Sequence, residues 1–221
     1  EFSLGLIICS MKNVFEVSAS TREAGWRADE EAYGRIKEMV GTKVGVVGAG
    51  HVGRHLLKLL RCFGVDVLLS DPTLTPEEAE ALGAKLVDLD TLMAESDVVS
   101  LHAPSIPSTR HMVNAKNLGL MKDGATLINT ARGSLIDEQA LISELSTGRI
   151  RACLDVTDPE PPAKDNPLRT MPNVVMTPHI AGTVSTGLVR LGRYAAEEIE
   201  RFIAGKPALN PVRQEQLKYL A

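Results

Sequence analysis

The sequence predicts a doubly wound α/β fold, in which helices cover both faces of a parallel sheet. Three observations lead to this fold class. Short runs rich in valine, isoleucine and leucine recur from Thr42 onward, helical patterns lie between them, and glycines follow the first run directly. Strands that are apolar throughout are typical of a sheet that is buried on both faces. Their alternation with helices favours parallel strands over a sandwich or barrel.

The predicted strands and helices alternate along the middle of the chain. Strands are predicted over residues 43–48, 65–70, 97–102, 125–129, 151–156 and 173–176. Helices are predicted where apolar residues recur at helical spacing, over residues 51–62, 75–82, 114–121 and 137–147. The proline-rich segment 158–167 is predicted to form a rigid loop.

Helical patterns also flank this alternating region. A single amphipathic helix is predicted over the first 18 residues from the apolar residues Leu4, Ile7, Ile8, Met11, Val14 and Phe15. Its apolar face has no obvious local partner, so we expect this helix to cover a subunit interface in a homodimer. A long helix is also predicted over 185–204, and Gly205 and Pro207 are placed to end it.

Composition limits the classes of function. The chain has 221 residues and a formal net charge of -4, so it lacks the positive field that attracts nucleic acids. Its apolar runs are too short to span a membrane. The three cysteines, Cys9, Cys62 and Cys153, form neither a disulfide nor a metal pattern. Because Cys62 and Cys153 lie in apolar runs, we expect buried reduced thiols, a cytoplasmic location and no metal site.

The first strand runs directly into the glycine motif Gly48-Ala49-Gly50-His51-Val52-Gly53. Gly48 permits a tight turn, Gly50 lets the backbone approach a pyrophosphate, and Gly53 lets the next helix pack closely on the strand. The N-terminus of that helix offers free N–H groups to phosphates. With a strand before it and a helix after it, the motif predicts a dinucleotide site.

An acidic residue follows the second strand. Asp71 lies 18 residues after Gly53, near the offset of about 20 residues expected for an acid that binds the ribose hydroxyls. A carboxylate there repels a 2′-phosphate, and no arginine follows soon after it, so NAD is favoured over NADP. The alternative is a glycine turn and a strand-end aspartate in a fold that binds another ligand.

Three further polar clusters follow predicted strands, at the edge where parallel α/β sheets bind ligands. Arg132 follows the strand over 125–129, and a guanidinium there can bind a carboxylate and polarise a carbonyl. Glu160 lies between two prolines, which stiffen the loop that carries its carboxylate. His179 follows the last strand and is a candidate acid or base at neutral pH.

Each of these three residues also has an ordinary structural explanation: a surface arginine, a solvated loop acid and a histidine that caps a turn. Together they form a set suited to hydride transfer. Arg132 would hold a substrate carboxylate, while His179 would protonate the carbonyl oxygen in reduction and take the proton back in oxidation. Glu160 would favour the protonated form of His179, and NAD would carry the hydride. Of the other histidines, His102 is expected to line the cofactor loop.

The motifs from about Thr42 to Gly182 resemble the D-isomer-specific 2-hydroxyacid dehydrogenases. The resemblance is carried by VGVVGAGHVGRHLLKLL, LHAPSIPSTRHMVN, MKDGATLINTARGSLIDEQALISEL, LDVTDPEP and NVVMTPHIAG. It implies a Rossmann NAD-binding domain, a small 2-hydroxy or 2-oxo acid as substrate, and catalytic roles for Arg132, Glu160 and His179. It also implies cofactor contacts at His51, Val52, Asp71, Ala103, Pro104, Thr109, Thr130, Ala131, Asp155 and Gly182. Among these, Asp155 matches the residue that holds the nicotinamide carboxamide.

The resemblance further implies a division into domains, because the substrate domain of this family is discontinuous. Residues 1–38 are expected to be a linking helix and arm, residues 39–182 the NAD-binding domain, and residues 183–221 a helix that returns to the substrate domain. Most of the N-terminal substrate domain, roughly 100 residues, is expected to be absent from this sequence. We therefore expect these 221 residues to bind NAD but to turn over slowly or not at all.

Two other functions share this scaffold. A non-catalytic NAD-sensing protein, similar to transcriptional corepressors that keep the arginine, glutamate and histidine, is the main alternative. An NAD-bound enzyme related to adenosylhomocysteine hydrolase lacks support, because no additional set of catalytic lysine and aspartate residues is apparent. The fold alone does not separate these functions, so the site residues must.

Overall fold

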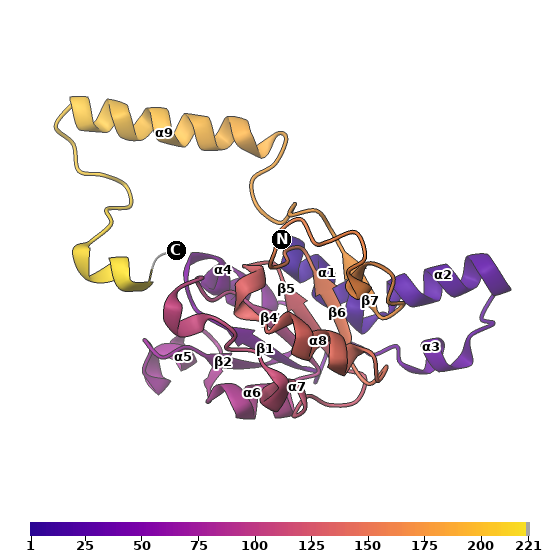
Figure 1. The fold of residues 1–221 in the computed structure, drawn as a ribbon. Coiled ribbons are helices and arrows are strands. Elements are labelled where there is room, and N and C mark those ends of the chain that lie inside the picture. Colours follow the sequence, from indigo (N-terminus) through magenta and orange to yellow (C-terminus); the bar gives the residue numbers. More distant parts are fainter. Residues whose placement is uncertain (220–221) are drawn as a thin grey trace.

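The computed structural model describes residues 1–219 and contains a seven-stranded parallel sheet between two layers of helices (Figure 1). The strands are β1 (Lys43–Val47), β2 (Asp66–Ser70), β3 (Lys85–Leu86), β4 (Val98–Leu101), β5 (Thr126–Asn129), β6 (Arg151–Leu154) and β7 (Val174–Met176). They are ordered β3-β2-β1-β4-β5-β6-β7, and each neighbouring pair is parallel. The predicted doubly wound α/β sheet is therefore confirmed. The order reverses between β1 and β4, which is where folds of this kind open a ligand crevice.

Helices connect the strands across both faces. They are α4 (His51–Leu60), α5 (Pro76–Ala81), α6 (Leu89–Glu95), α7 (Ala115–Leu118) and α8 (Glu138–Leu145). Helix α7 is shorter than predicted. Strand β3 and helix α6 were not predicted, because a two-residue strand and a seven-residue helix show too little of the repeating pattern.

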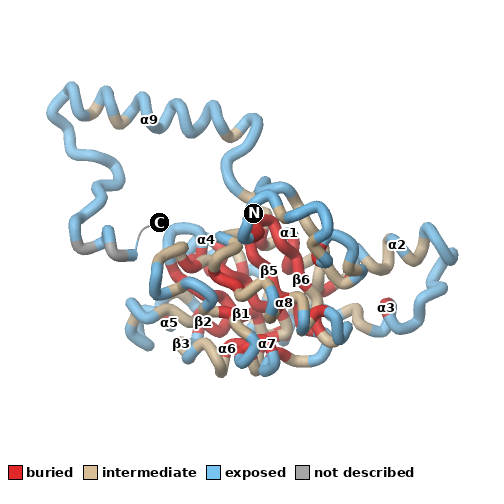
Figure 2. Tube along the Cα trace, in the orientation of Figure 1, coloured by how far each residue is buried: buried red, intermediate tan, exposed pale blue. Residues whose placement is uncertain are grey.

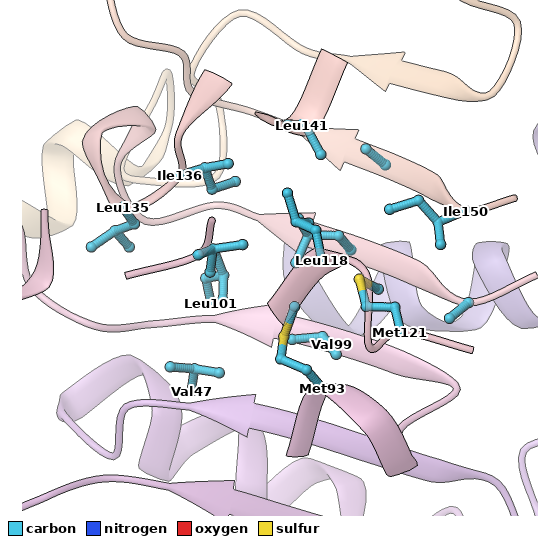
Figure 3. Close-up of a cluster of buried hydrophobic side chains, with 14 of the residues drawn as sticks. Val47, Met93, Val99, Leu101, Leu118, Met121, Leu135, Ile136, Leu141 and Ile150 are labelled. Atoms are coloured by element: carbon cyan, nitrogen blue, oxygen red, sulfur yellow. The ribbon is translucent and has the colours of Figure 1, made fainter. Parts of the chain in front are cut away.

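Two apolar cores lie on opposite faces of the sheet. Successive strand residues point to opposite sides, so Val98 and Ile128 join one core while Val99 and Leu127 join the other. Figure 3 shows the second core, where Leu118 lies among side chains that include Val99. Full burial of such side chains contributes about 1.5–3 kcal/mol each. This packing on both faces fixes the strand ends that carry the candidate site.

The N-terminal segment forms two helices, α1 (Phe2–Met11) and α2 (Val14–Ala24), instead of the one helix predicted. The break falls at Asn13, whose φ of 47° lies in the left-handed region. Leu6 and Ile7 of α1 are buried in the core that α4 also joins. The prediction that this helix lacks an internal partner is therefore wrong. Its partner surface comes from α4, β4 and β5, which lie far along the chain.

Helices α2 and α3 (Glu30–Gly34) form an arm that projects from the body (Figure 1). No residue of α2 is buried against the described part of the chain, and Trp26, between the two helices, is 86% exposed. Glu16 forms two salt bridges at the base of the arm. Its Oε2 lies 2.6 Å from Nη2 of Arg35, and its Oε1 lies 2.5 Å from Nε of Arg151. Burial alone would raise the pKa of Glu16, but hydrogen bonds from Arg151, Arg35 and Asn13 hold this pKa below its usual value.

The long C-terminal helix, α9 (Gly187–Ile203), stands away from the sheet and is exposed along its length (Figure 2). Gly205, with a φ of 64°, follows its end as predicted. A short helix, η4 (Gln214–Tyr219), comes last. Between residues 1 and 219 no single helix is long and apolar enough to cross a membrane, although α1 and α2 together pass by length and composition with a 55° bend. The division at residues 38 and 182 stays a prediction.

The cysteines match the expectation only in part. Cys153 is buried, and burial raises the pKa of its thiol to about 11. The expectation of a buried thiol is wrong for Cys62, which is exposed. Helix α4 ends at Leu60, two residues earlier than predicted, so Cys62 lies in the turn that follows it.

Candidate active site

The predicted site residues gather at one edge of the sheet, because each follows the carboxyl end of a strand. The glycine motif follows β1, and Asp71 follows β2. Strand β4 is followed by Ala103, Pro104 and Thr109, and strand β5 by Thr130, Ala131 and Arg132. Strand β6 is followed by Asp155 and Glu160, and strand β7 by His179 and Gly182. Parallel order therefore brings together residues that are more than 130 positions apart in the sequence.

The three glycines of the motif meet different surroundings. A Cβ atom on Gly48 would lie 2.7 Å from the backbone nitrogen of Ala103, and one on Gly53 would lie 2.1 Å from the carbonyl oxygen of Gly48. By contrast, apart from the atoms of Gly50 and its two chain neighbours, no atom of the described residues lies within 4 Å of a Cβ atom on Gly50. Protein packing thus requires the first and last glycines, whereas the middle glycine borders open space, as approach of a phosphate requires.

The start of α4 offers unpaired N–H groups at this open space. Gly50 is the N-cap residue, and within residues 1–219 no side chain caps the helix. His51 and Val52, the first two residues of α4, are exposed at the same place. The free N–H groups and the positive end of the helix dipole favour an anion, so this loop fits the pyrophosphate of a dinucleotide.

Asp71 lies directly beside the glycine motif. Its Oδ2 accepts a hydrogen bond from the N–H of Ala49 at 2.6 Å, and its Oδ1 accepts from the N–H and hydroxyl of Thr73 at 2.8 and 2.6 Å. These bonds keep the carboxylate next to the phosphate loop, where the ribose of a dinucleotide would lie. The geometry thus fits the ribose-binding role expected from the spacing.

His102 lies beneath the glycine motif. Its Cβ would be 3.6 Å from a Cβ on Gly53, and its Nε2 shares a hydrogen bond of 2.8 Å with the hydroxyl of Ser100. Burial lowers the pKa of His102 to about 4, so the ring is neutral at physiological pH. It therefore packs under the cofactor loop as an uncharged side chain.

We expect this buried ring to make the fold sensitive to acid. The pKa of His102 is 6.5 in its ordinary state and about 4 in the folded chain, so the unfolded chain takes up the proton first. The contribution of the neutral ring to the free energy of unfolding is therefore fully present above pH 6.5. As the pH falls towards 4, up to about 3 kcal/mol of this contribution is lost. Urea unfolding of wild type and His102→Gln between pH 7.5 and 4.5 checks this. The variant should lose less stability, and parallel curves for the two proteins would contradict the assignment.

The segment after β4 is shaped by a threonine. The Thr109 hydroxyl donates to the carbonyl oxygen of Pro104 at 2.6 Å and accepts from the N–H of Ile106 at 3.0 Å. Across the sheet edge, the hydroxyls of Thr130 and Ser3 lie 2.9 Å apart. Ser3 was not predicted as part of the site, because α1 approaches it from a distant part of the sequence.

Arg132 is presented by a loop that a buried asparagine shapes. Asn129 is fully buried; its amide nitrogen donates to the carbonyl oxygen of Arg132 at 2.8 Å, and its oxygen accepts from the N–H of Ala131 at 3.0 Å. The Arg132 side chain makes one hydrogen bond to the described residues, from Nη1 to the Ala131 carbonyl at 2.7 Å. Its other N–H groups remain available. A Cβ on Gly133 would lie 2.0 Å from the Thr157 backbone, so this loop must pack tightly on the next one.

Glu160 and His179 are brought into direct contact. The Oε1 of Glu160 lies 2.6 Å from the Nδ1 of His179, and the two side chains are 42% and 43% exposed. Both line a cavity of about 530 Å³, together with Pro161 and Met176. Because Nδ1 is engaged, Nε2 is the ring atom left to meet a ligand. Arg132 does not line this cavity; it lies in the loop after β5.

Asp155 is the one buried carboxylate among the predicted site residues that the structure describes. It is 1% exposed, and its two oxygens accept hydrogen bonds from the segment that carries His179. Gly182 follows this segment and is exposed. The resemblance implied only a cofactor contact for Asp155, whereas the structure gives it contacts within the protein.

Comparison with known proteins gives the family of this chain. A family model described as D-isomer specific 2-hydroxyacid dehydrogenase, NAD binding domain, matches residues 4–181. The D-3-phosphoglycerate dehydrogenase of Methanocaldococcus jannaschii is 37% identical over 219 residues, which are 98% of this chain and 41% of that protein. The hydroxypyruvate reductase of Thermotoga maritima is 37% identical over 90% of this chain and 64% of its own length.

A solved structure shows the same fold. The TT0316 protein from Thermus thermophilus matches with a TM-score of 0.80 and 36% identity, over 96% of this chain and 67% of that chain. This chain spans only about two fifths of the length of the M. jannaschii dehydrogenase. The family match covers most of the chain, including the glycine motif at residues 48–53. The chain belongs to the family of D-isomer-specific 2-hydroxyacid dehydrogenases and carries its NAD-binding domain, whose cofactor is NAD.

Proposed function

We propose that this chain provides the cofactor site and the acid/base residues of an enzyme that transfers a hydride between a nicotinamide and a small D-2-hydroxy or 2-oxo acid. One observation supports this most strongly. The 2.6 Å contact between His179 Nδ1 and Glu160 Oε1 lies at the same sheet edge as the glycine motif. Relatives named as a dehydrogenase and a reductase of small hydroxy acids agree with this substrate class.

His179 would move the proton. With Nδ1 held by Glu160, Nε2 can donate a proton to the substrate oxygen in reduction and remove it in oxidation. The Glu160 carboxylate fixes the orientation of the ring. When bound, NAD supplies or accepts the hydride.

Arg132 would hold the substrate acid. Its side chain uses one N–H group on the carbonyl of Ala131, so a fork of donors is left for a carboxylate. A guanidinium beside the reacting carbonyl also stabilises the negative charge that develops on its oxygen. The corepressor-like alternative gains no support, because the relatives reported above are enzymes by name.

The proposed reaction is tested by mixing the chain with NADH and either glyoxylate or hydroxypyruvate and following NADH absorbance. We expect the 221 residues to bind NADH but to reduce these acids slowly. A longer protein that adds the expected substrate domain should reduce at least one of a panel of 2-oxo acids and form the D product. Formation of the L product, or no reduction of any 2-oxo acid by the longer protein, would contradict the proposal.

We also propose that the protein forms a homodimer, through the α2–α3 arm and not through α1, whose residues Leu6, Ile7 and Met11 are buried in the protein's own core. The projecting arm with its exposed Trp26 supports this, because tryptophan is enriched where interfaces bind most strongly. The cytoplasmic location and the absence of nucleic-acid and membrane partners stay predictions from composition.

We expect Trp26→Ser to raise the dimer dissociation constant by at least about tenfold, since the side chain would leave the interface. Light scattering coupled to gel filtration over a range of concentrations measures this. Val40→Ser is the matched control, because Val40 is 77% exposed and lies outside the arm. Equal dissociation constants for the two variants, or a wild-type monomer at every concentration, would contradict the proposed interface.

A further inference from the structure

Asp155 combines deep burial with the absence of a cationic partner. Its side chain follows β6 and is 1% exposed, and within residues 1–219 no lysine, arginine or histidine forms an ion pair with it. A buried carboxylate without a cation is costly unless hydrogen bonds replace the lost water. The groups that donate hydrogen bonds to the Asp155 carboxylate therefore indicate the role of this residue.

All of these donors come from one short segment, residues 177–181. The Oδ1 of Asp155 accepts from the hydroxyl of Thr177 at 2.5 Å and from the N–H of Ile180 at 2.9 Å, and its Oδ2 accepts from the N–H of Ala181 at 2.8 Å. The carbonyl oxygen of Asp155 accepts from the N–H of His179 at 2.9 Å. One aspartate thus binds the backbone or side chains on both sides of the candidate acid/base residue.

The backbone of His179 needs such support. Its φ is 55°, in the left-handed region that residues other than glycine rarely adopt. This conformation is unfavourable for a residue with a Cβ atom and persists only where the surroundings enforce it. The four bonds to Asp155 supply that enforcement, and the resulting turn points the imidazole at Glu160, 2.6 Å away.

We infer that Asp155 is a positioning residue, whose buried carboxylate locks the turn over residues 177–181 and so holds the His179 ring against Glu160. The inference deepens the proposed function, on which its catalytic meaning rests. A carboxylate has about four acceptor positions, and the turn occupies three of them. The nicotinamide contact implied by the family resemblance could use only what remains, and all three of these bonds lie within the protein itself.

This last point makes the inference testable in the cofactor-free chain. Asp155→Asn keeps the shape of the side chain but replaces one acceptor oxygen with a donor NH₂ group, which cannot accept from the turn. We expect backbone amide exchange at Ile180 and Ala181 to be about tenfold faster or more, as loss of a hydrogen bond allows. We also expect the downfield proton resonance of the His179 Nδ1–H group, which its hydrogen bond to Glu160 protects, to disappear.

Two control variants separate this role from general loss of structure. Asp97→Asn is the matched control, since Asp97 is mostly buried and accepts from Lys37 and from the N–H of Lys43 at the opposite edge of the sheet. It should lower stability while leaving the ring resonance and the exchange at Ile180 unchanged. Glu160→Ala removes the acceptor of the His179 Nδ1–H group, so it should abolish the ring resonance but leave the amide protection, because the turn is held from the other side.

Thr177→Val covers the case in which Asp155→Asn does not fold. It removes one of the three side-chain bonds with little change in shape, and it should speed exchange at Ile180 and weaken the ring resonance. The inference is overturned if the aspartate variant, or Thr177→Val in its place, keeps both the amide protection and the ring resonance. NADH titration distinguishes failure of the proposed function, because a wild-type chain with an intact ring resonance that binds no NADH would contradict that function and leave the lock standing.

Discussion

Replacing His179 with glutamine is expected to lower the turnover number for reduction of a 2-oxo acid by about 10²–10⁴-fold. Glutamine can still accept or donate a hydrogen bond, but it cannot release and recover a proton at neutral pH. Cofactor affinity should change little, because His179 follows β7, whereas the glycine motif proposed to bind the phosphates follows β1. Steady-state rates give the turnover number, and NADH fluorescence titration gives the affinity.

His55→Gln is the control for the histidine substitution. His55 is exposed on α4 and makes no hydrogen bond through its side chain within the described chain, so its replacement should leave the rate unchanged. A His179→Gln enzyme with more than a tenth of the wild-type turnover number would contradict the acid/base assignment. A rate that falls only in step with NADH affinity would contradict it as well.

The second large effect is expected from two alanine substitutions within one motif. Gly53→Ala places a Cβ atom 2.1 Å from the carbonyl oxygen of Gly48, a backbone atom that cannot move aside without distorting the loop. We expect it to lower the free energy of unfolding by about 3 kcal/mol. Gly50→Ala meets no described atom within 4 Å, so the fold should stay within about 0.5 kcal/mol of wild type.

The same two variants differ in what they do to the cofactor. Although Gly50→Ala leaves the fold intact, its methyl group occupies the space through which a phosphate approaches the backbone, so NADH affinity should fall at least about tenfold. Urea unfolding and NADH titration of both variants measure the two effects. If Gly50→Ala bound NADH as wild type does, the open space beside Gly50 would not be the pyrophosphate site.

The parts of the fold that the sequence predicted are those with a local pattern. Apolar runs such as residues 43–48 mark buried strands, because both faces of a parallel strand must be apolar. Strand β3 and helix α6 are too short to show a period, and they are held by contacts with β2 and β1. Helix α1 was predicted, but its burial was not, since its partners α4, β4 and β5 become neighbours only when the sheet forms.

The candidate site divides in the same way. The three glycines of the motif were predicted from their fixed spacing. A tight turn needs Gly48, approach of a phosphate to the backbone needs Gly50, and close packing of the helix on the strand needs Gly53. Arg132, Glu160 and His179 were predicted because each follows a strand and matches a family motif, and the structure brings Glu160 and His179 into contact. The roles of Asn129 and Asp155 depend on hydrogen bonds to neighbouring loops, and polar residues at strand ends offer only a weak signal of such bonds. Ser3 reaches Thr130 across 127 positions, which no local pattern records.

The central claim is that the edge of the sheet between β1 and β4 binds NAD, with Asp71 selecting it over NADP. Calorimetric titration of the chain with NADH and with NADPH tests this most directly. One NADH should bind per chain, and NADPH should bind at least about tenfold more weakly, because the Asp71 carboxylate beside Ala49 repels a 2′-phosphate. Absence of NADH binding, or tighter binding of NADPH, would contradict the account.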